Sequence, residues 1–222
     1  MAQDHGHDDF QVEPIRGLPE LPPEGERILW QGAPEWRALA WRAFGLPWVI
    51  GYFAAITLWR ASAVMEASPS IGAGLQAAIG WCAPLALLGA GVCAVLALMA
   101  YVQAKATVYT ITNRRVAMRI GAALTVTLNL PYRWIGSADL LPGRRGVGTI
   151  RMQLLGSTRL SYLVCWPHVR PWRVARTEPC LRCVPEAERV ASILGAAAEA
   201  RLEQQATLER PAALQAASIA AE

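Results

Sequence analysis

The chain has 222 residues, of which 54% are apolar or aromatic and only 17% are charged. A typical soluble domain has about 25% charged residues, so the composition indicates a membrane protein of one or two domains. It excludes a chain that is disordered over most of its length, because disorder requires low hydrophobicity and high net charge. The five Cys are too sparse, and odd in number, for a secreted disulfide framework.

The net charge of +4 is unevenly distributed along the chain. Residues 1–37 belong to an acidic, Pro-rich segment, and residues 1–42 hold eight acids against four Arg. Residues 105–176 hold twelve basic groups against a single acid, Asp139. Such a basic block favours an anionic partner, which we expect to be a lipid surface or an acidic protein face rather than nucleic acid.

Two uncharged runs predict a transmembrane helical hairpin. The runs cover residues 43–59 and 67–104, which are 17 and 38 residues long. A spanning helix needs about 20 apolar residues, so we expect helices over about 38–59 and 75–103, joined by a short loop. Splitting the longer run into two helices would give three spans, although it would leave little chain for a turn.

Basic residues flank the hairpin unequally, which predicts its orientation. Arg37 and Arg42 accompany the first run and Lys105 follows the second, whereas Arg60 alone lies between them. The positive-inside rule therefore predicts a multi-pass protein with both termini in the cytoplasm and the short loop in the periplasm. The first run does not fit a cleavable signal peptide, because a long acidic stretch precedes it.

Residues 105–205 change to a period of two, which indicates strands followed by one helix. Alternating apolar residues predict strands at 109–112, 116–120, 124–130, 150–154 and 160–164. Pro185 and an apolar stripe predict the helix, and the stripe contains Val190, Ile193, Leu194 and Ala197. The expected fold is α+β: a transmembrane hairpin, then an antiparallel β-barrel or sandwich capped by one C-terminal helix, then an Ala-rich tail at 206–222.

Several strings in this region resemble the bacterial pleckstrin-homology (PH) domain. They are YTITNRRV at 109–116, LPYRWIGS at 130–137 and GVGTI at 146–150. In that family a membrane hairpin commonly precedes the domain. The resemblance implies a PH-like fold for the cytoplasmic residues 105–205.

A narrower resemblance extends over residues 20–200. WQGAPEWRAL at 30–39, TLNLPY at 127–132 and IGSAD at 135–139 resemble the PuhB-type photosynthetic-complex assembly proteins of purple bacteria. This resemblance implies a non-catalytic protein of the bacterial inner (intracytoplasmic) membrane, acting singly or as a homodimer. Its partners would be subunits of the photosynthetic reaction centre and its light-harvesting antenna. The alternative is a PH-like membrane module of general envelope function that binds lipid headgroups.

Two sets of residues are candidates for contacts with such partners. The candidates for binding an acidic partner or anionic lipid are Arg114, Arg115, Arg119, Arg144 and Arg145. The first two lie at a turn about ten residues after the hairpin, and the last two lie in a loop. The candidates for helix packing, against the first span or a second copy, are Ala86, Ala90 and Ala94, which repeat every four residues. The alternatives are a solvated basic face and a chain that is rich in Ala throughout.

The sequence offers little for catalysis or metal binding. Cys165, His168, Cys180 and Cys183 have the pairwise spacing of zinc ligands, but nothing in the sequence brings the two pairs together. Ordinary reduced thiols are the alternative. General acid–base chemistry draws on His, Asp or Glu, and residues 105–176 contain one Asp and one His. We therefore expect no enzyme activity, no cofactor and no metal.

Overall fold

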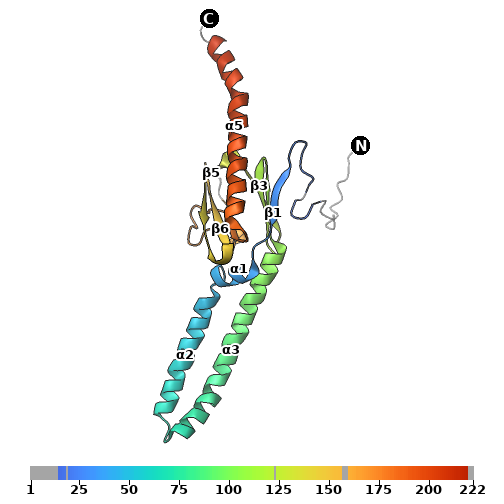
Figure 1. The fold of residues 1–222 in the computed structure, drawn as a ribbon. Helices are drawn as coiled ribbons and strands as arrows, with labels where there is room; N and C mark the ends of the chain where they lie inside the picture. Colours follow the sequence, from blue (N-terminus) through green and yellow to red (C-terminus); the bar gives the residue numbers. More distant parts are fainter. Residues whose placement is uncertain (1–14, 19, 123, 157–159, 220–222) are drawn as a thin grey trace, which may run out of the picture.

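A helical hairpin carries a domain made of two antiparallel sheets and a long helix (Figure 1). The computed structural model describes residues 15–18, 20–122, 124–156 and 160–219, with side chains up to residue 204 and at Thr207. The first 14 residues of the acidic segment and the last three of the Ala-rich tail therefore lie outside the described residues.

The hairpin consists of α2 (Leu46–Glu66) and α3 (Ile71–Ala106). The prediction of a single helix over about 38–59 is wrong at its start, because α1 (Trp36–Arg42) is a separate helix. Gly45 has a φ of +67°, a left-handed conformation that favours glycine, and the adjoining first turn of α2 contains proline. The chain therefore changes direction at Gly45. The alternative of two helices within 67–104 is also wrong, since α3 continues through Pro84.

The two helices of the hairpin pack through small residues of α3. Gly74, Ala78 and Gly89 are buried. A Cβ atom added to Gly89 would lie 2.7 Å from Cγ of Phe53 on α2, so only glycine permits this approach. Ala86, Ala90 and Ala94 are exposed in the chain, and so they do not pack against the first span.

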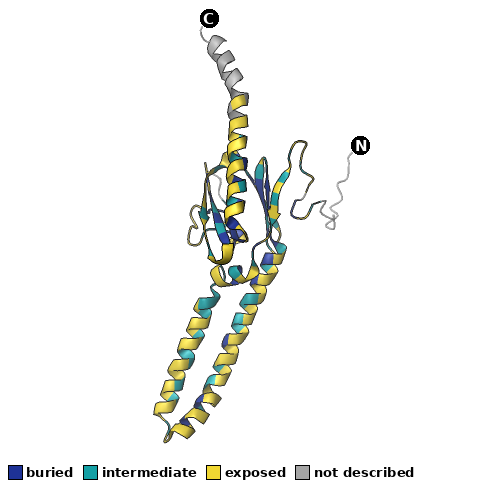
Figure 2. Cartoon of the chain, in the orientation of Figure 1, coloured by how far each residue is buried: buried dark blue, intermediate teal, exposed yellow. Residues whose placement is uncertain are grey.

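The outer surface of the hairpin is apolar and exposed (Figure 2). The most apolar 18 residues of α2 are 0% buried and those of α3 are 11% buried, and both helices are long and apolar enough to cross a membrane. A core helix of a soluble protein would bury most of such a stretch. Trp48 and Ile71, for example, are more than four-fifths exposed, at 84% and 81%.

The strands of the domain form two separate antiparallel sheets, so the barrel in our expectation is wrong and the domain is an open sandwich. The first sheet is ordered β1-β2-β3-β4 and contains β1 (Ile28–Gly32), β2 (Val108–Thr112), β3 (Arg115–Ile120) and β4 (Val126–Pro131). The second is ordered β5-β6-β7 and contains β5 (Ile135–Leu141), β6 (Gly148–Leu154) and β7 (Cys180–Val184). Short 3-10 turns lie at Tyr132–Trp134 and Arg144–Gly146.

The strand predictions at 109–112, 116–120 and 150–154 are confirmed, and the one at 124–130 is confirmed from Val126 onward. The strand prediction at 160–164 is wrong. Tyr162–Cys165 forms the short helix α4, in which Cys165 is buried and Tyr162 packs against the core. A run of only five residues can direct its apolar side chains to the core from a strand or from a short helix. The alternating pattern therefore did not distinguish the two.

Strand β1 comes from the segment before the hairpin and pairs with β2, with Trp30 opposite Ile111. Part of the predicted N-terminal segment therefore belongs to the same sheet as residues that follow the hairpin. The hairpin is inserted between two neighbouring strands.

The core of the domain lies between the two sheets and helix α5 (Ala187–Ile219). Tyr109 and Met118 of the first sheet meet Met152 and Leu181 of the second, all fully buried. The predicted C-terminal helix is confirmed, and it covers the sandwich with the stripe that contains Val190, Leu194 and Ala197. Its backbone continues through residues 206–219 of the predicted tail (Figure 1).

The contact between Gly89 and Phe53 yields a prediction about the hairpin. We expect Gly89→Leu to force the helices apart and lower the free energy of unfolding by about 1–3 kcal/mol, the usual cost of overpacking. Gly80→Leu is the matched control because Gly80 is exposed on the same helix and a Cβ there would meet nothing within 4 Å. Thermal unfolding of the purified protein in an uncharged detergent measures both. Equal melting temperatures for the two variants would contradict the packing described here.

Candidate binding surface between the domain and the hairpin

Helix α1 is held at the junction between the domain and the hairpin. The Glu35 side chain caps its first turn by accepting hydrogen bonds from the backbone N–H groups of Arg37 (3.2 Å) and Ala38 (2.7 Å). The Glu35 backbone N–H donates to the carbonyl of Cys183 on β7, at 2.8 Å. Leu39 is 0% exposed and packs between Ala104 of α3 and Cys183. The helix is therefore fixed to the hairpin and to the second sheet at once.

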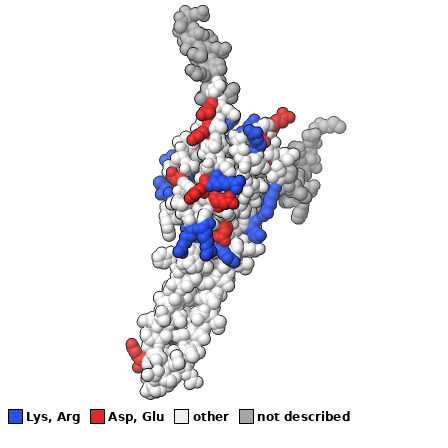
Figure 3. All heavy atoms as spheres, in the orientation of Figure 1, with Lys and Arg blue, Asp and Glu red and all other residues white. Residues whose placement is uncertain are grey.

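The position of α1 brings four Arg together into a basic patch, which comprises Arg37, Arg42, Arg144 and Arg145. They line a hollow of about 810 Å³ beside Trp41 and Glu35. In Figure 3, Lys and Arg side chains gather where the domain meets the almost uncharged hairpin. The loop that carries Arg144 and Arg145 lies close to α1: a Cβ atom added to Gly143 would lie 2.6 Å from a guanidinium nitrogen of Arg42.

The five Arg predicted as one binding set are thus divided by the structure. Arg144 and Arg145 belong to the basic patch. Arg119 is half-buried on β3, opposite Val108 at the start of β2, near the end of α3. Arg114 and Arg115 follow β2 at its other end, so β2 carries them away from the hairpin rather than holding them beside it.

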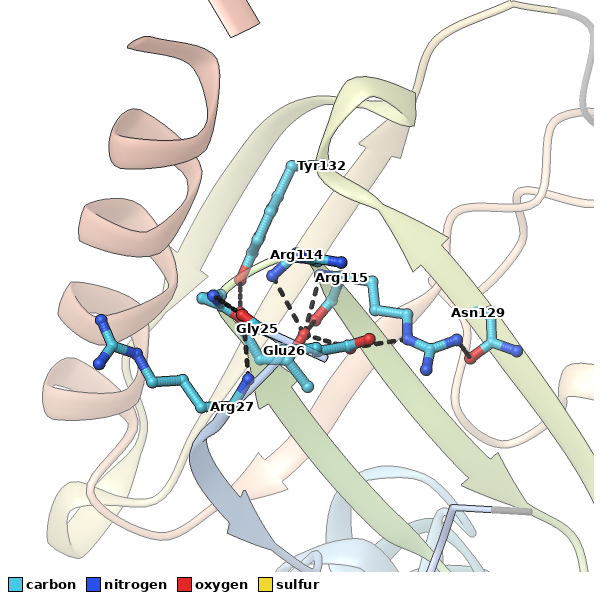
Figure 4. A network of polar contacts seen from close by, with 9 residues as sticks. Gly25, Glu26, Arg27, Arg114, Arg115, Asn129 and Tyr132 are labelled. Carbon is cyan, nitrogen blue, oxygen red and sulfur yellow. Dashed lines mark hydrogen bonds and ion pairs between the residues drawn. The ribbon is translucent and has the colours of Figure 1, made fainter. Parts of the chain in front are cut away.

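Arg115 has a partner within the chain (Figure 4). Its Nε lies 2.9 Å from Oε1 of Glu26, whose side chain is 3% exposed. The Thr112 hydroxyl donates to the same carboxylate oxygen at 2.8 Å. Asn113 completes the link by donating to the carbonyl of Gly25 at 2.9 Å and accepting from the N–H of Arg27 at 2.9 Å. This network fixes the segment before β1 to the turn between β2 and β3.

Comparison with known proteins assigns the chain to a family. The family model for the bacterial PH domain matches residues 38–198, which is more than half of the chain. The chain belongs to the bacterial PH domain family. The family that the sequence resembles is thereby confirmed, and the match begins after β1, within α1.

A relative covers almost the whole of this bacterial PH domain protein. It is a Rhodobacter capsulatus protein described as an uncharacterized 23.7 kDa protein in the 5' region of puhA. The two are 42% identical over 214 residues, which is 96% of this chain and 98% of the relative. No solved structure gives a significant match.

A buried hydrogen-bond chain ties the bacterial PH domain to the end of α3. His168 is fully buried, and its Nδ1 and Nε2 lie 2.6 Å from the Tyr109 hydroxyl and 3.0 Å from the Thr107 hydroxyl. Thr107 donates to the carbonyl of Gln103 on α3, at 2.8 Å. The backbone N–H of Arg182 on β7 donates to the Tyr109 oxygen at 3.2 Å.

The surroundings of Tyr109 and His168 determine where the protons lie in this hydrogen-bond chain. Burial raises the pKa of Tyr109, so its phenol remains protonated and donates to Nδ1. Burial, reinforced by the Arg182 guanidinium, lowers the pKa of His168 to about 3. His168 is therefore neutral at pH 7, with its proton on Nε2 directed to Thr107.

The thiols of the domain are buried and protonated. Burial raises the pKa of Cys165, that of Cys180 to about 12 and that of Cys183 to about 11, so these groups have little thiolate character at neutral pH. Among the described residues there is no group of three or more His, Cys, Asp or Glu side chains able to hold a metal ion. His168 instead serves the hydrogen-bond chain.

Sequence reasoning missed a second set of Arg near α1. Arg42, Arg151, Arg170 and Arg182 line one cavity, although they come from α1, β6, the loop before β7 and β7, in that order. A weak signal was present, since Arg151 alternates with the apolar residues Ile150 and Met152 and so had to lie on the outer face of its strand. These four Arg come together because β6 pairs with β7 and because α1 packs against the second sheet.

The low pKa of His168 yields a prediction about stability and pH. Between pH 6.5 and pH 4.5 the unfolded state binds a proton at His168 that the folded state excludes. The free energy of unfolding should therefore decrease as pH falls, by about 1.4 kcal/mol per pH unit from this group. Chemical unfolding of the wild type and H168Q across this range measures the contribution as the difference in slope. Equal slopes of the free energy of unfolding against pH in the wild type and H168Q would contradict this contribution of His168.

Proposed function

We propose that this protein is a non-catalytic membrane factor for assembly of the photosynthetic reaction centre and its light-harvesting antenna. The observation that carries the proposal is the relative from Rhodobacter capsulatus, which matches nearly the whole chain and whose gene lies in the 5' region of puhA. The resemblance of residues 30–39, 127–132 and 135–139 to PuhB-type assembly proteins supports the same role. Membership of the bacterial PH domain family favours binding rather than catalysis.

In this proposal the hairpin crosses the bacterial inner membrane. Helix α2 has 21 residues and is about 31 Å long at 1.5 Å per residue, close to the hydrocarbon thickness of about 30 Å. Helix α3 has 36 residues and so extends past the membrane to the level of α1. The basic patch favours a cytoplasmic domain by the positive-inside rule, with both termini on that side.

Two surfaces are available for partners in this arrangement. The basic patch faces the plane in which acidic segments of membrane subunits, or anionic lipids, would lie. The exposed Ala86, Ala90 and Ala94 offer α3 a close approach to a helix of another subunit or of a second copy. An assembly factor of this kind would hold a partner by its membrane helix and by its cytoplasmic face.

The proposed topology can be tested with reporter fusions. A reporter that is active only outside the cytoplasm should be active when fused at Ala67, between the two helices of the hairpin. The same reporter should be silent after residue 222, because both termini are then cytoplasmic. An active C-terminal fusion would contradict two spans with a cytoplasmic domain.

The assembly role can be tested by reversing charge in the basic patch. In a strain that lacks the chromosomal gene, R144E/R145E should fold and insert but restore roughly tenfold less reaction-centre complex than wild type, because charge-assisted hydrogen bonds are lost. Absorbance of isolated membranes measures the complex. R27E/R133E, a reversal at two exposed Arg, is the matched control.

Two results would contradict parts of this proposal. A wild-type yield of complex in R144E/R145E would show that Arg144 and Arg145 do not contribute to partner binding. A wild-type yield of reaction-centre complex in the strain without the gene would contradict the assembly role. It would favour a lipid-binding module of general envelope function.

A further inference from the structure

A cavity of about 300 Å³ lies on the outer face of the second sheet, next to the end of α1. Four Arg line it: Arg42, Arg151, Arg170 and Arg182. The remaining lining residues are uncharged, and they are Leu141, Pro142, Thr149, Val169, Pro171 and Cys180. No carboxylate is among the lining residues. A cavity with such a lining favours an anion.

Two of these Arg are held within the protein without an acidic partner. Arg182 is 8% exposed, and its guanidinium donates to the carbonyls of Pro167 (3.0 Å) and Arg42 (3.3 Å). Arg151 has an Nε that is buried and has no hydrogen-bond partner in the part of the chain that the structure describes. Leaving such a donor unsatisfied is costly, so this position favours a further acceptor.

The nearby acids do not neutralise the four positive charges. Glu178 is engaged by two Arg at once, with Arg170 at 2.9 Å and Arg173 at 3.5 Å. Asp139, opposite Arg151 on β5, is the second carboxylate near the cavity, so two carboxylates stand against five Arg: the four that line the cavity and Arg173. The cavity therefore keeps an excess of positive charge in a partly buried place, where screening by salt is weak.

The position of the cavity indicates where its anion comes from. Arg42 is the last residue of α1, and α2 begins at Leu46. Given the membrane placement proposed above, on which this inference rests, the cavity opens at the level of the lipid headgroups. Guanidinium groups match phosphate oxygens in a bidentate geometry, and 300 Å³ is enough for a phosphate and its ester groups.

We propose that this cavity binds the phosphate group of an anionic phospholipid. The bound phosphate joins Arg42, at the entrance to the hairpin, to Arg151 and Arg182 of the second sheet. A lipid in this site therefore fixes the orientation of the domain on the membrane surface. Arg37, Arg144 and Arg145 of the basic patch do not line this cavity and remain free for a protein partner.

The test is calorimetric titration of the full-length protein in an uncharged detergent. The probes are dihexanoyl phosphatidylglycerol, dihexanoyl phosphatidylcholine and inorganic phosphate. We expect the anionic lipid to bind, R151Q to weaken that binding at least tenfold, and R151K, which keeps the charge, to weaken it less. We expect phosphatidylcholine to bind at least tenfold more weakly, because its choline is repelled by the four Arg.

R133Q is the matched control, since Arg133 is an exposed Arg outside the cavity, and it should bind as wild type does. Equal binding by wild type and R151Q, or no binding of the anionic lipid, overturns the proposal. Inorganic phosphate that binds as tightly as the lipid would overturn the lipid assignment in favour of a soluble phosphate. These outcomes are separate from the assembly role, which is measured by complex yield in cells.

Discussion

The arrangement of this molecule depends on the junction at the end of α3. There the buried His168 joins Thr107, the residue that ends the helix, to Tyr109 of the first sheet. Tyr109 in turn accepts from the backbone of β7 in the second sheet. Leu39 of α1 fills the adjoining space against Ala104 and Cys183. The hairpin, α1 and both sheets are therefore held by one buried region rather than by a single covalent linker.

This hydrogen-bond chain gives the junction a defined geometry and is itself made of neutral side chains. Each of its members is satisfied, and a neutral imidazole meets the requirement for one donor and one acceptor. Apolar packing alone would leave the orientation of the hairpin less defined, because it is not directional. This orientation decides which charged residues of the domain face the apolar hairpin.

The Arg of this chain consequently serve several different purposes. Arg115 is bound to the buried Glu26 and stabilises the edge strand that precedes the hairpin. Arg182 donates to two carbonyls and supports the junction. Arg144 and Arg145 are exposed beside α1. A high count of Arg in the sequence therefore does not describe one continuous binding face.

The sequence by itself determined the features that depend on local pattern. Runs of uncharged residues predicted the hairpin, alternation predicted β2, β3, β4 and β6, and the apolar stripe after Pro185 predicted α5, because each pattern expresses burial along one element. The strings at 109–116 and 130–137 identified the family. Only the tertiary structure decided which distant residues meet. It paired β1 with β2 across the whole hairpin, and it brought Arg42, Arg151 and Arg182 to one cavity. Such contacts depend on strand pairing and on the position of α1, and no local periodicity in the sequence encodes either of them.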